Sequence, residues 1–133
     1  MIARTTLTAV AAAALTLPVC LVGPAMASHG GGGDDVRTSG HCSGSAHWKL
    51  KAKPDDGRLD VEGEVDVNRN GQTWNWKILR NGNVAAHGTA TTRGPSGSFS
   101  VERKIANPAG TDRIGWRAKN PATGQTCSGS LSI

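Results

Sequence analysis

The sequence predicts an antiparallel all-β domain of seven strands. From residue 42 onward, apolar and polar residues alternate with a period of two, and turn-forming residues interrupt this alternation at short intervals. No window of this region has the apolar period of a helix. Cys42 and Cys127 lie near the two ends of the region, as expected for a small exported domain closed by one disulfide.

Residues 1–27 are predicted to be a cleaved signal peptide. A single positive charge, on Arg4, precedes an apolar run over 7–22. Small residues then occupy the −3 and −1 positions of a cut after Ala27, so that the secreted protein begins at Ser28. We therefore expect an extracellular protein.

Two alternatives to cleavage are a retained membrane anchor and a lipidated Cys20. The apolar run is shorter than the about 20 residues of a spanning helix, and it contains Pro18. The residue before a lipidated cysteine is normally small, whereas here it is Val19. Both features favour cleavage, with no membrane attachment afterwards.

Residues 28–41 are predicted to be a flexible tail. Four consecutive glycines, 30–33, are followed by acidic and other polar residues, which bury almost no apolar surface. The folded domain is therefore expected at 42–133. The formal net charge of the whole chain is +5, which favours solubility but specifies no partner.

Seven strands follow the tail, and turn-forming residues bound each of them. The alternation places the strands at 44–53, 58–67, 72–80, 84–93, 98–105, 112–119 and 125–133. Short segments rich in proline, asparagine and glycine connect most of them, which predicts a series of hairpins. A longer loop, 106–111, separates the fifth and sixth strands.

The turns predict a register for three hairpins. They close over 54–57, 81–83 and 121–124, and the first also pairs Leu50 with Val61. Each register sets an inward tryptophan opposite a glycine, where the ring covers the empty position. These pairs are Trp48 with Gly63, Trp76 with Gly88, and Trp116 with Gly129.

The connection 94–97 predicts a fourth hairpin, in which Ala90 pairs with Val101. In this register Arg103 faces inward, opposite Gly88. A bulge, a strand end and a buried ion pair are the three explanations for an arginine there.

Lysines alternate along the first strand and suggest a basic stripe for nucleic acid or heparin. The first-hairpin register instead sets Lys51 opposite Asp60 and Lys49 opposite Glu62. We therefore interpret the lysines as half of a solvated ion-pair ladder, and we expect no nucleic-acid partner.

Two residues are weak candidates for ligand contacts. Trp74 lies towards the end of its strand, where its ring is either core edge or a partly exposed contact for a ligand. Cleavage after Ala27 would leave an amine on Ser28 beside His29, a short chelate for copper or nickel. The histidine spacing matches no zinc motif, so no metal and no cofactor are predicted.

A catalytic site is not expected. The sequence has no nucleophile elbow and no phosphate-binding glycine loop. The acidic cluster 60–66 belongs to the paired outer face.

The domain resembles an immunoglobulin-type sandwich, with seven short strands, Trp76 on the third strand and the first and last strands tied together. Its cysteines depart from the antibody pattern, which joins the second and sixth strands. More narrowly, the chain resembles uncharacterised small secreted proteins of actinomycetes. The similar segments are 48–66, 71–82, 94–101 and 110–131. The resemblance implies export and an immunoglobulin-like β-sandwich, and it implies no activity.

Three hypotheses of function follow. We favour a secreted, non-catalytic domain, monomeric, that binds an extracellular protein or glycan. A structural role at the cell surface is the alternative. A secreted enzyme is the third and weakest possibility, because enzyme sites need convergent polar groups in a pocket.

Overall fold

A computed structural model of the chain describes residues 35–133, and all of its regular structure is β. The all-β prediction is confirmed, with one strand more than the seven predicted. The strands are β1 (Val36–His41), β2 (His47–Asp55), β3 (Arg58–Asp66), β4 (Thr73–Arg80), β5 (Asn83–Thr91), β6 (Ser98–Ala106), β7 (Arg113–Lys119) and β8 (Thr126–Ser132). Strands β2 to β8 lie close to the seven predicted ranges.

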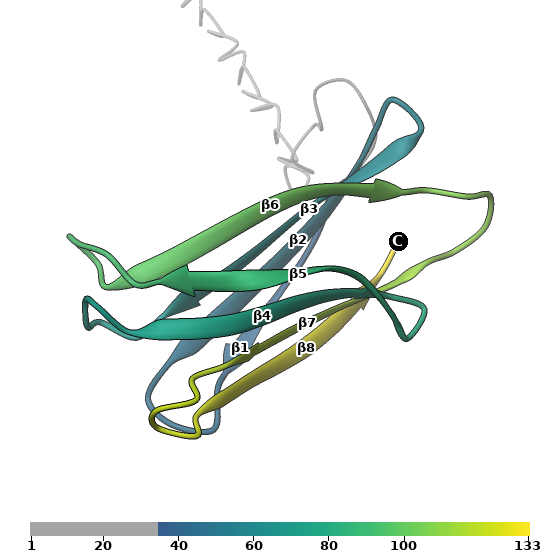
Figure 1. Cartoon of the computed structure of the whole chain (residues 1–133). Coiled ribbons are helices and arrows are strands. Elements are labelled where there is room, and N and C mark those ends of the chain that lie inside the picture. Colours follow the sequence, from purple (N-terminus) through teal and green to yellow (C-terminus); the bar gives the residue numbers. More distant parts are fainter. Residues whose placement is uncertain (1–34) are drawn as a thin grey trace, which may run out of the picture.

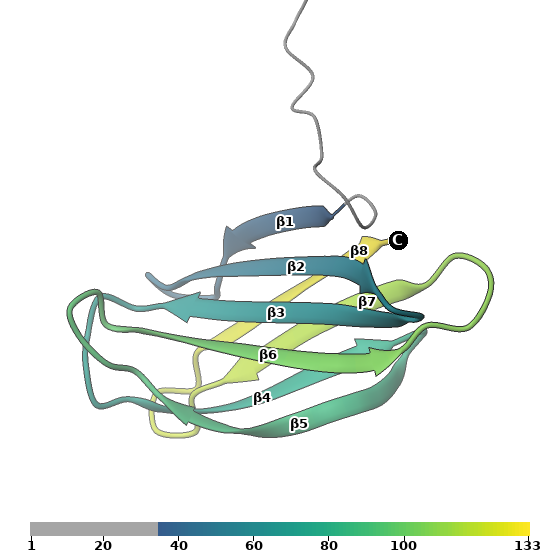
Figure 2. The ribbon, with the colours of Figure 1, turned by 90° about the horizontal axis from the view of Figure 1, so that it is seen from above.

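The strands form a sandwich of two four-stranded antiparallel sheets (Figure 1). Sheet A has the order β1-β2-β3-β6, and sheet B has the order β5-β4-β7-β8. Seen through sheet A, strands β7 and β8 cross obliquely behind β2 and β3 (Figure 2). Within the described residues no helix is long and apolar enough to span a membrane.

The extra strand corrects the prediction of a flexible tail over 28–41, because residues 36–41 form β1. This strand pairs along its whole length with β2, and Gly40 lies opposite Trp48. A Cβ on Gly40 would come within 2.9 Å of the Trp48 indole, so the ring already covers that position. β1 is thus held by backbone pairing, by one neighbouring ring and by Val36, which packs against the core, and these leave little apolar pattern in its own sequence.

The register predicted for the first hairpin is wrong by two residues. Leu50 pairs with Gly63, and Val61 pairs with Ala52. The turn consists of two residues, Asp56 and Gly57, with φ of 48° and 75°. Two successive left-handed residues are typical of a type I′ hairpin, which Asp-Gly favours, so the strands extend further than a four-residue loop would allow.

The registers of the other two hairpins are confirmed. Trp116 pairs with Gly129 in β7–β8, and Trp76 pairs with Gly88 in β4–β5. The loop at 81–83 is shorter than expected, because Asn81 and Gly82 form a two-residue turn with φ of 51° and 85°. A bulge between Ile78 and Leu79 restores the predicted register further along the strand.

The fourth hairpin is wrong as a strand pair. Arg93 and Ser98 form a single bridge in the expected register, but β5 and β6 then diverge into different sheets. Ala90 therefore pairs with Trp74 rather than with Val101. A short turn can pair one residue on each side without pairing the two strands along their length. Here the chain crosses from one layer of the sandwich to the other after that single pair.

A chain of aromatic rings runs through the core between the sheets. Trp116 stacks on Trp76 with ring centroids 6.2 Å apart, and it contacts Phe99 of the opposite sheet at 6.3 Å. Phe99 continues to Trp74 at 6.4 Å. Tryptophan also contacts glycine across the two layers: a Cβ on Gly63 would overlap the ring of Trp116. The Trp48–Gly63 pair that we predicted is replaced by this contact.

Candidate functional site

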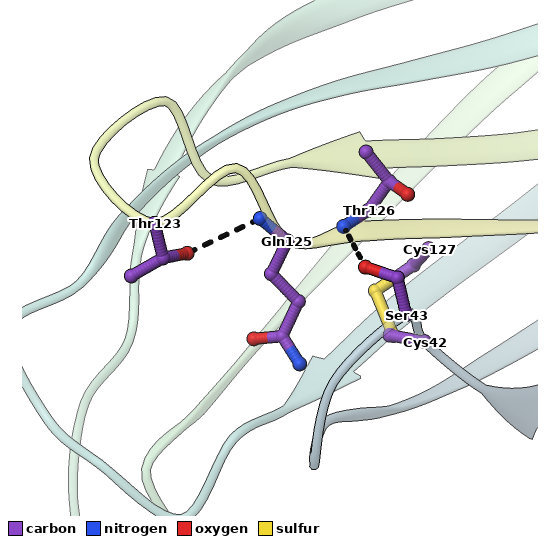
Figure 3. Close-up of a disulfide and its surroundings, with 6 residues drawn as sticks. All are labelled: Cys42, Ser43, Thr123, Gln125, Thr126 and Cys127. Atoms are coloured by element: carbon purple, nitrogen blue, oxygen red, sulfur yellow. Dashed lines mark hydrogen bonds between the residues drawn. A yellow bond between two sulfur atoms is a disulfide. The ribbon is translucent and has the colours of Figure 1, made fainter.

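The disulfide between Cys42 and Cys127 is confirmed, and it ties the β1–β2 connection to the start of β8 (Figure 3). Beside it, the Ser43 N–H donates to the carbonyl of Thr126 at 2.8 Å, and the Thr126 N–H donates to the Ser43 hydroxyl at 2.9 Å. The two bridged cysteines are separated by 85 positions in the sequence. The bridge fastens one sheet to the other at this end of the sandwich.

The loop after Cys42 is held by the side chain of Gln125, which points towards it in Figure 3. With its amide oxygen turned to the loop, Gln125 accepts hydrogen bonds from the backbone N–H groups of Gly44, Ser45 and Ala46, at 3.0–3.1 Å. These three N–H groups are therefore satisfied by hydrogen bonds within the chain, and this end of the sandwich has a structural role.

Trp74 is completely buried, with 0% of its surface exposed. Its ring is part of the core, so it presents no face to a ligand. Arg103 has an inward register position, opposite the buried Val61, but its side chain is exposed. Its guanidinium lies over the ring of Trp76, 5.0 Å from the centroid, and donates to the carbonyl of Glu102 at 2.7 Å. A cation–π contact replaces the buried ion pair that we considered.

The buried polar residues hold turns together. The Thr92 hydroxyl donates to the carbonyl of Arg69 at 2.6 Å, and Asn120 accepts from the N–H of Ala122 at 2.9 Å. Asp112, 3% exposed, accepts from the side chain of Asn81 at 3.0 Å. These three buried polar groups, from different loops, are thus engaged in local structure.

The outer face of sheet A carries rows of opposite charge, as predicted, but with the corrected register. Lys51 lies opposite Glu62, and their charged atoms are 3.4 Å apart. Lys49 lies opposite Glu64. Further along the sheet, Lys104 bonds Asp55 at 2.8 Å. The Lys104 ammonium, by hydrogen bond and by charge, lowers the pKa of Asp55 below its usual value of 3.8. The lysines of this face thus meet carboxylates of the same face.

An acidic pair also lies on sheet A. Asp60 raises the pKa of Glu102 above its usual value of 4.5, first because the protonated Glu102 can hydrogen-bond it and then because the two charges repel. Glu102 also lies directly opposite Glu62. The ladder of this face therefore carries a local excess of negative charge beside its ion pairs.

Two histidines meet at the end of the β1–β2 ladder. His41 pairs with His47, and their ring centroids are 4.5 Å apart. Nowhere in 35–133 do three histidine, cysteine or acidic side chains gather as metal ligands would. The predicted cleavage site between Ala27 and Ser28, and the chelate candidate His29, lie outside the described residues.

The outer face of sheet B differs sharply in charge from that of sheet A. The strands β4, β5, β7 and β8 contain no aspartate or glutamate. Lys77 lies directly opposite Arg117, and Lys119 follows two residues along β7; all three side chains are exposed. The acidic residue that flanks a strand of this sheet, Asp112, is buried. This basic face, defined by Lys77, Arg113, Arg117 and Lys119, has no carboxylate partners on its own strands.

A groove of about 380 Å³ crosses this basic face. Its floor is apolar, because Leu79 shares the outward register of Lys77 and lies against Gly115, with 9% of its surface exposed. Arg113 and Arg117 lie on either side of Gly115 along β7. The remaining lining residues are Gly82, Ser128, Gly129 and Ser130, and Arg113 donates to the Ser130 hydroxyl at 3.1 Å.

A groove of similar size, about 400 Å³, lies on the outer face of sheet A. It is lined by charges of both signs, including Arg37, Lys51 and Glu62. Groove size therefore does not distinguish the two faces, whereas uncompensated positive charge does.

The sequence analysis did not single out the basic face. The sequence does show one difference between the two sheets: the lysines at 49–53 are followed by acidic residues over 55–66, whereas no acidic residue occurs in 73–91 or 113–132. Those lysines drew attention because they are close in sequence. Lys77 and Arg117 meet only through the pairing of β4 with β7.

The chain was compared with family models, with curated proteins and with solved structures, and none of the three comparisons gave a match.

Proposed function

We propose that the protein is an exported, non-catalytic binding domain whose basic face, on sheet B, binds an anionic extracellular partner. The observation that carries this proposal is the direct opposition of Lys77 and Arg117 on a face without carboxylates. Like charges opposite each other on a sheet are destabilising, and a partner that neutralises them offsets this cost. Sheet A also sets like charges opposite each other, at Arg37–Lys51 and at Glu62–Glu102, but basic and acidic side chains share its outer face.

The fold of this domain is proposed to be an immunoglobulin-like sandwich. Without β1, sheet A has the order β2-β3-β6 and sheet B the order β5-β4-β7-β8. If β2 is counted as the first strand, sheet A contains the first, second and fifth strands, and sheet B contains the fourth, third, sixth and seventh. This matches strands A, B and E on one sheet and C, F and G on the other, with one further strand beside C. The disulfide departs from the immunoglobulin pattern, because it joins the segment just before the first of these strands to the last strand.

Export is supported by the predicted signal peptide and by the disulfide, which persists in oxidising compartments. Intact-mass measurement of the secreted protein tests it, with Ser28 expected as the first residue. A lipid adduct on Cys20 would place the protein on the membrane instead.

The absence of catalysis is supported by the roles of the buried polar residues. Thr92, Asp112 and Asn120 hold separate turns, and they come from different loops. Catalytic sites need such groups to converge on one cavity. Binding across the charged outer face of a sheet requires no such convergence.

Charge-matched variants on the two faces test the binding proposal. Lys77→Ser with Arg117→Ser, and Lys49→Ser with Lys51→Ser, remove the same formal charge from opposite sides of the sandwich. On immobilised heparin, the sheet B variant should elute at clearly lower salt than the unmodified protein, because contacts with the polymer are lost. The sheet A variant should elute near the unmodified protein. Equal shifts for both would show that net charge alone governs retention and would contradict the proposal.

A further inference from the structure

Gly115 is unlike the other glycines of the sheets. Gly40, Gly63, Gly88 and Gly129 are each covered by a tryptophan ring that leaves no room for a Cβ. A Cβ on Gly115 would instead meet Leu79 at 3.4 Å, which is ordinary van der Waals contact. Neither a left-handed backbone nor core packing requires glycine here.

Because Gly115 has no side chain, the groove on the basic face stays open. A side chain at this position projects outward from β7, between Arg113 and Arg117. It would fill the space above Leu79. Glycine weakens a strand, so its presence here is explained better by the groove than by the sheet.

The groove presents three kinds of contact together. Leu79 and the Gly115 backbone offer a small apolar floor. Ser128 supplies an exposed hydroxyl at the edge, and the two arginines supply positive charge at the ends. Guanidinium groups suit carboxylates, phosphates and sulfates, because they donate paired hydrogen bonds.

We infer that the groove over Gly115 binds one sugar unit of an acidic polysaccharide. The C–H face of the sugar lies on Leu79, its hydroxyls bond the serines, and its anionic group binds Arg113 or Arg117. This inference rests on the proposed function and adds the chemical class of the ligand.

The same features disfavour other polyanions. Single-stranded nucleic acids bind by stacking bases on aromatic side chains, and all four tryptophans are buried. A polyglutamate chain would engage the arginines but carries no hydroxyl groups for the serine edge. A sugar acid uses all three.

Binding of polygalacturonate and polyglutamate, at equal carboxylate concentration, tests the inference. The unmodified protein should bind the saccharide about tenfold more tightly, a difference that a few polar and apolar contacts supply. Gly115→Val should remove this preference while leaving polyglutamate binding unchanged. Ser128→Ala with Ser130→Ala, which leaves the backbone and the groove open, should reduce the preference in the same direction. Ser100→Ala on sheet A is the matched control and should change nothing.

Equal affinity for the two polymers, or tighter binding of single-stranded DNA, would overturn the inference. So would unchanged saccharide binding in both groove variants. If the charge-matched variants still separate on heparin, these outcomes leave the proposed function standing. If the protein binds none of the polymers, both proposals fail together.

Discussion

Trp48 of β2 and Gly129 of β8 meet across the sandwich, so closely that a Cβ on Gly129 would overlap the six-membered ring of Trp48. The two residues lie in different sheets. Gly129 is also the strand partner of Trp116, and Trp116 in turn covers Gly63 of sheet A. Tryptophan and glycine therefore interlock the two layers in both directions.

This interlocking predicts the cost of adding side chains. Gly129→Val and Gly63→Val should each lower the free energy of unfolding by about 1–3 kcal/mol, because an overpacked core must shift. Denaturant unfolding followed by tryptophan fluorescence measures the effect. Gly115→Ala, which meets only ordinary contact with Leu79, serves as the control and should leave the midpoint nearly unchanged. Valine tolerated at both sites would mean that the layers do not interlock in this way.

Removal of the disulfide should destabilise the fold without changing it. The bridge closes a loop that spans most of the domain, and cross-links of this kind constrain the unfolded chain. Cys42→Ser with Cys127→Ser should lower stability by about 2–5 kcal/mol, as in other small secreted domains. The far-ultraviolet spectrum of the double variant should keep its sheet signature. Two thiols that titrate freely in the native protein would contradict the bridge.

Much of this architecture could be predicted from the sequence, and the errors have physical causes. The β7–β8 register was predicted correctly because its connection has the length that its turn residues suggest. The β2–β3 register was missed because Asp56-Gly57 closes the strands in two residues, where the prediction used four. Alternation is unaffected by a slip of two, so the inward face of β2 was still assigned correctly.

Strand β1 and the basic face could not be predicted in the same way. β1 depends on backbone bonds to β2 and on the ring of Trp48, which do not appear in its own composition. The basic face depends on which strands become neighbours, since Lys77 meets Arg117 only after β4 and β7 pair. Pairing between distant strands is a property of the topology rather than of any local segment.

The acidic pair on sheet A predicts a pH dependence of stability. The pKa of Glu102 is raised in the folded protein, by hydrogen bonding to Asp60 and by repulsion from it. Its contribution to stability is therefore present below the unfolded pKa and is lost as pH rises through the folded pKa. Glu102→Gln removes a charge that the fold disfavours, so the variant should melt at a higher temperature than the unmodified protein at pH 7.

The advantage of Glu102→Gln should shrink as the pH falls towards 3, where Glu102 is protonated in both states. Thermal unfolding across this range measures the effect, which is small because Glu102 is exposed to solvent. Glu64→Gln, opposite Lys49, is the control and should not raise the melting temperature at pH 7. A constant difference between Glu102→Gln and the unmodified protein from pH 3 to pH 7 would refute the assignment.

Binding on one face of the sandwich can be mapped residue by residue. The ¹⁵N-labelled protein is titrated with polygalacturonate, and its amide chemical shifts are followed. The largest changes are expected at Lys77, Gly115, Arg117 and Ser128 on sheet B, with Lys49 and Lys51 on sheet A unaffected. Changes centred on the outer face of sheet A, or spread equally over both faces, would contradict binding at the basic face.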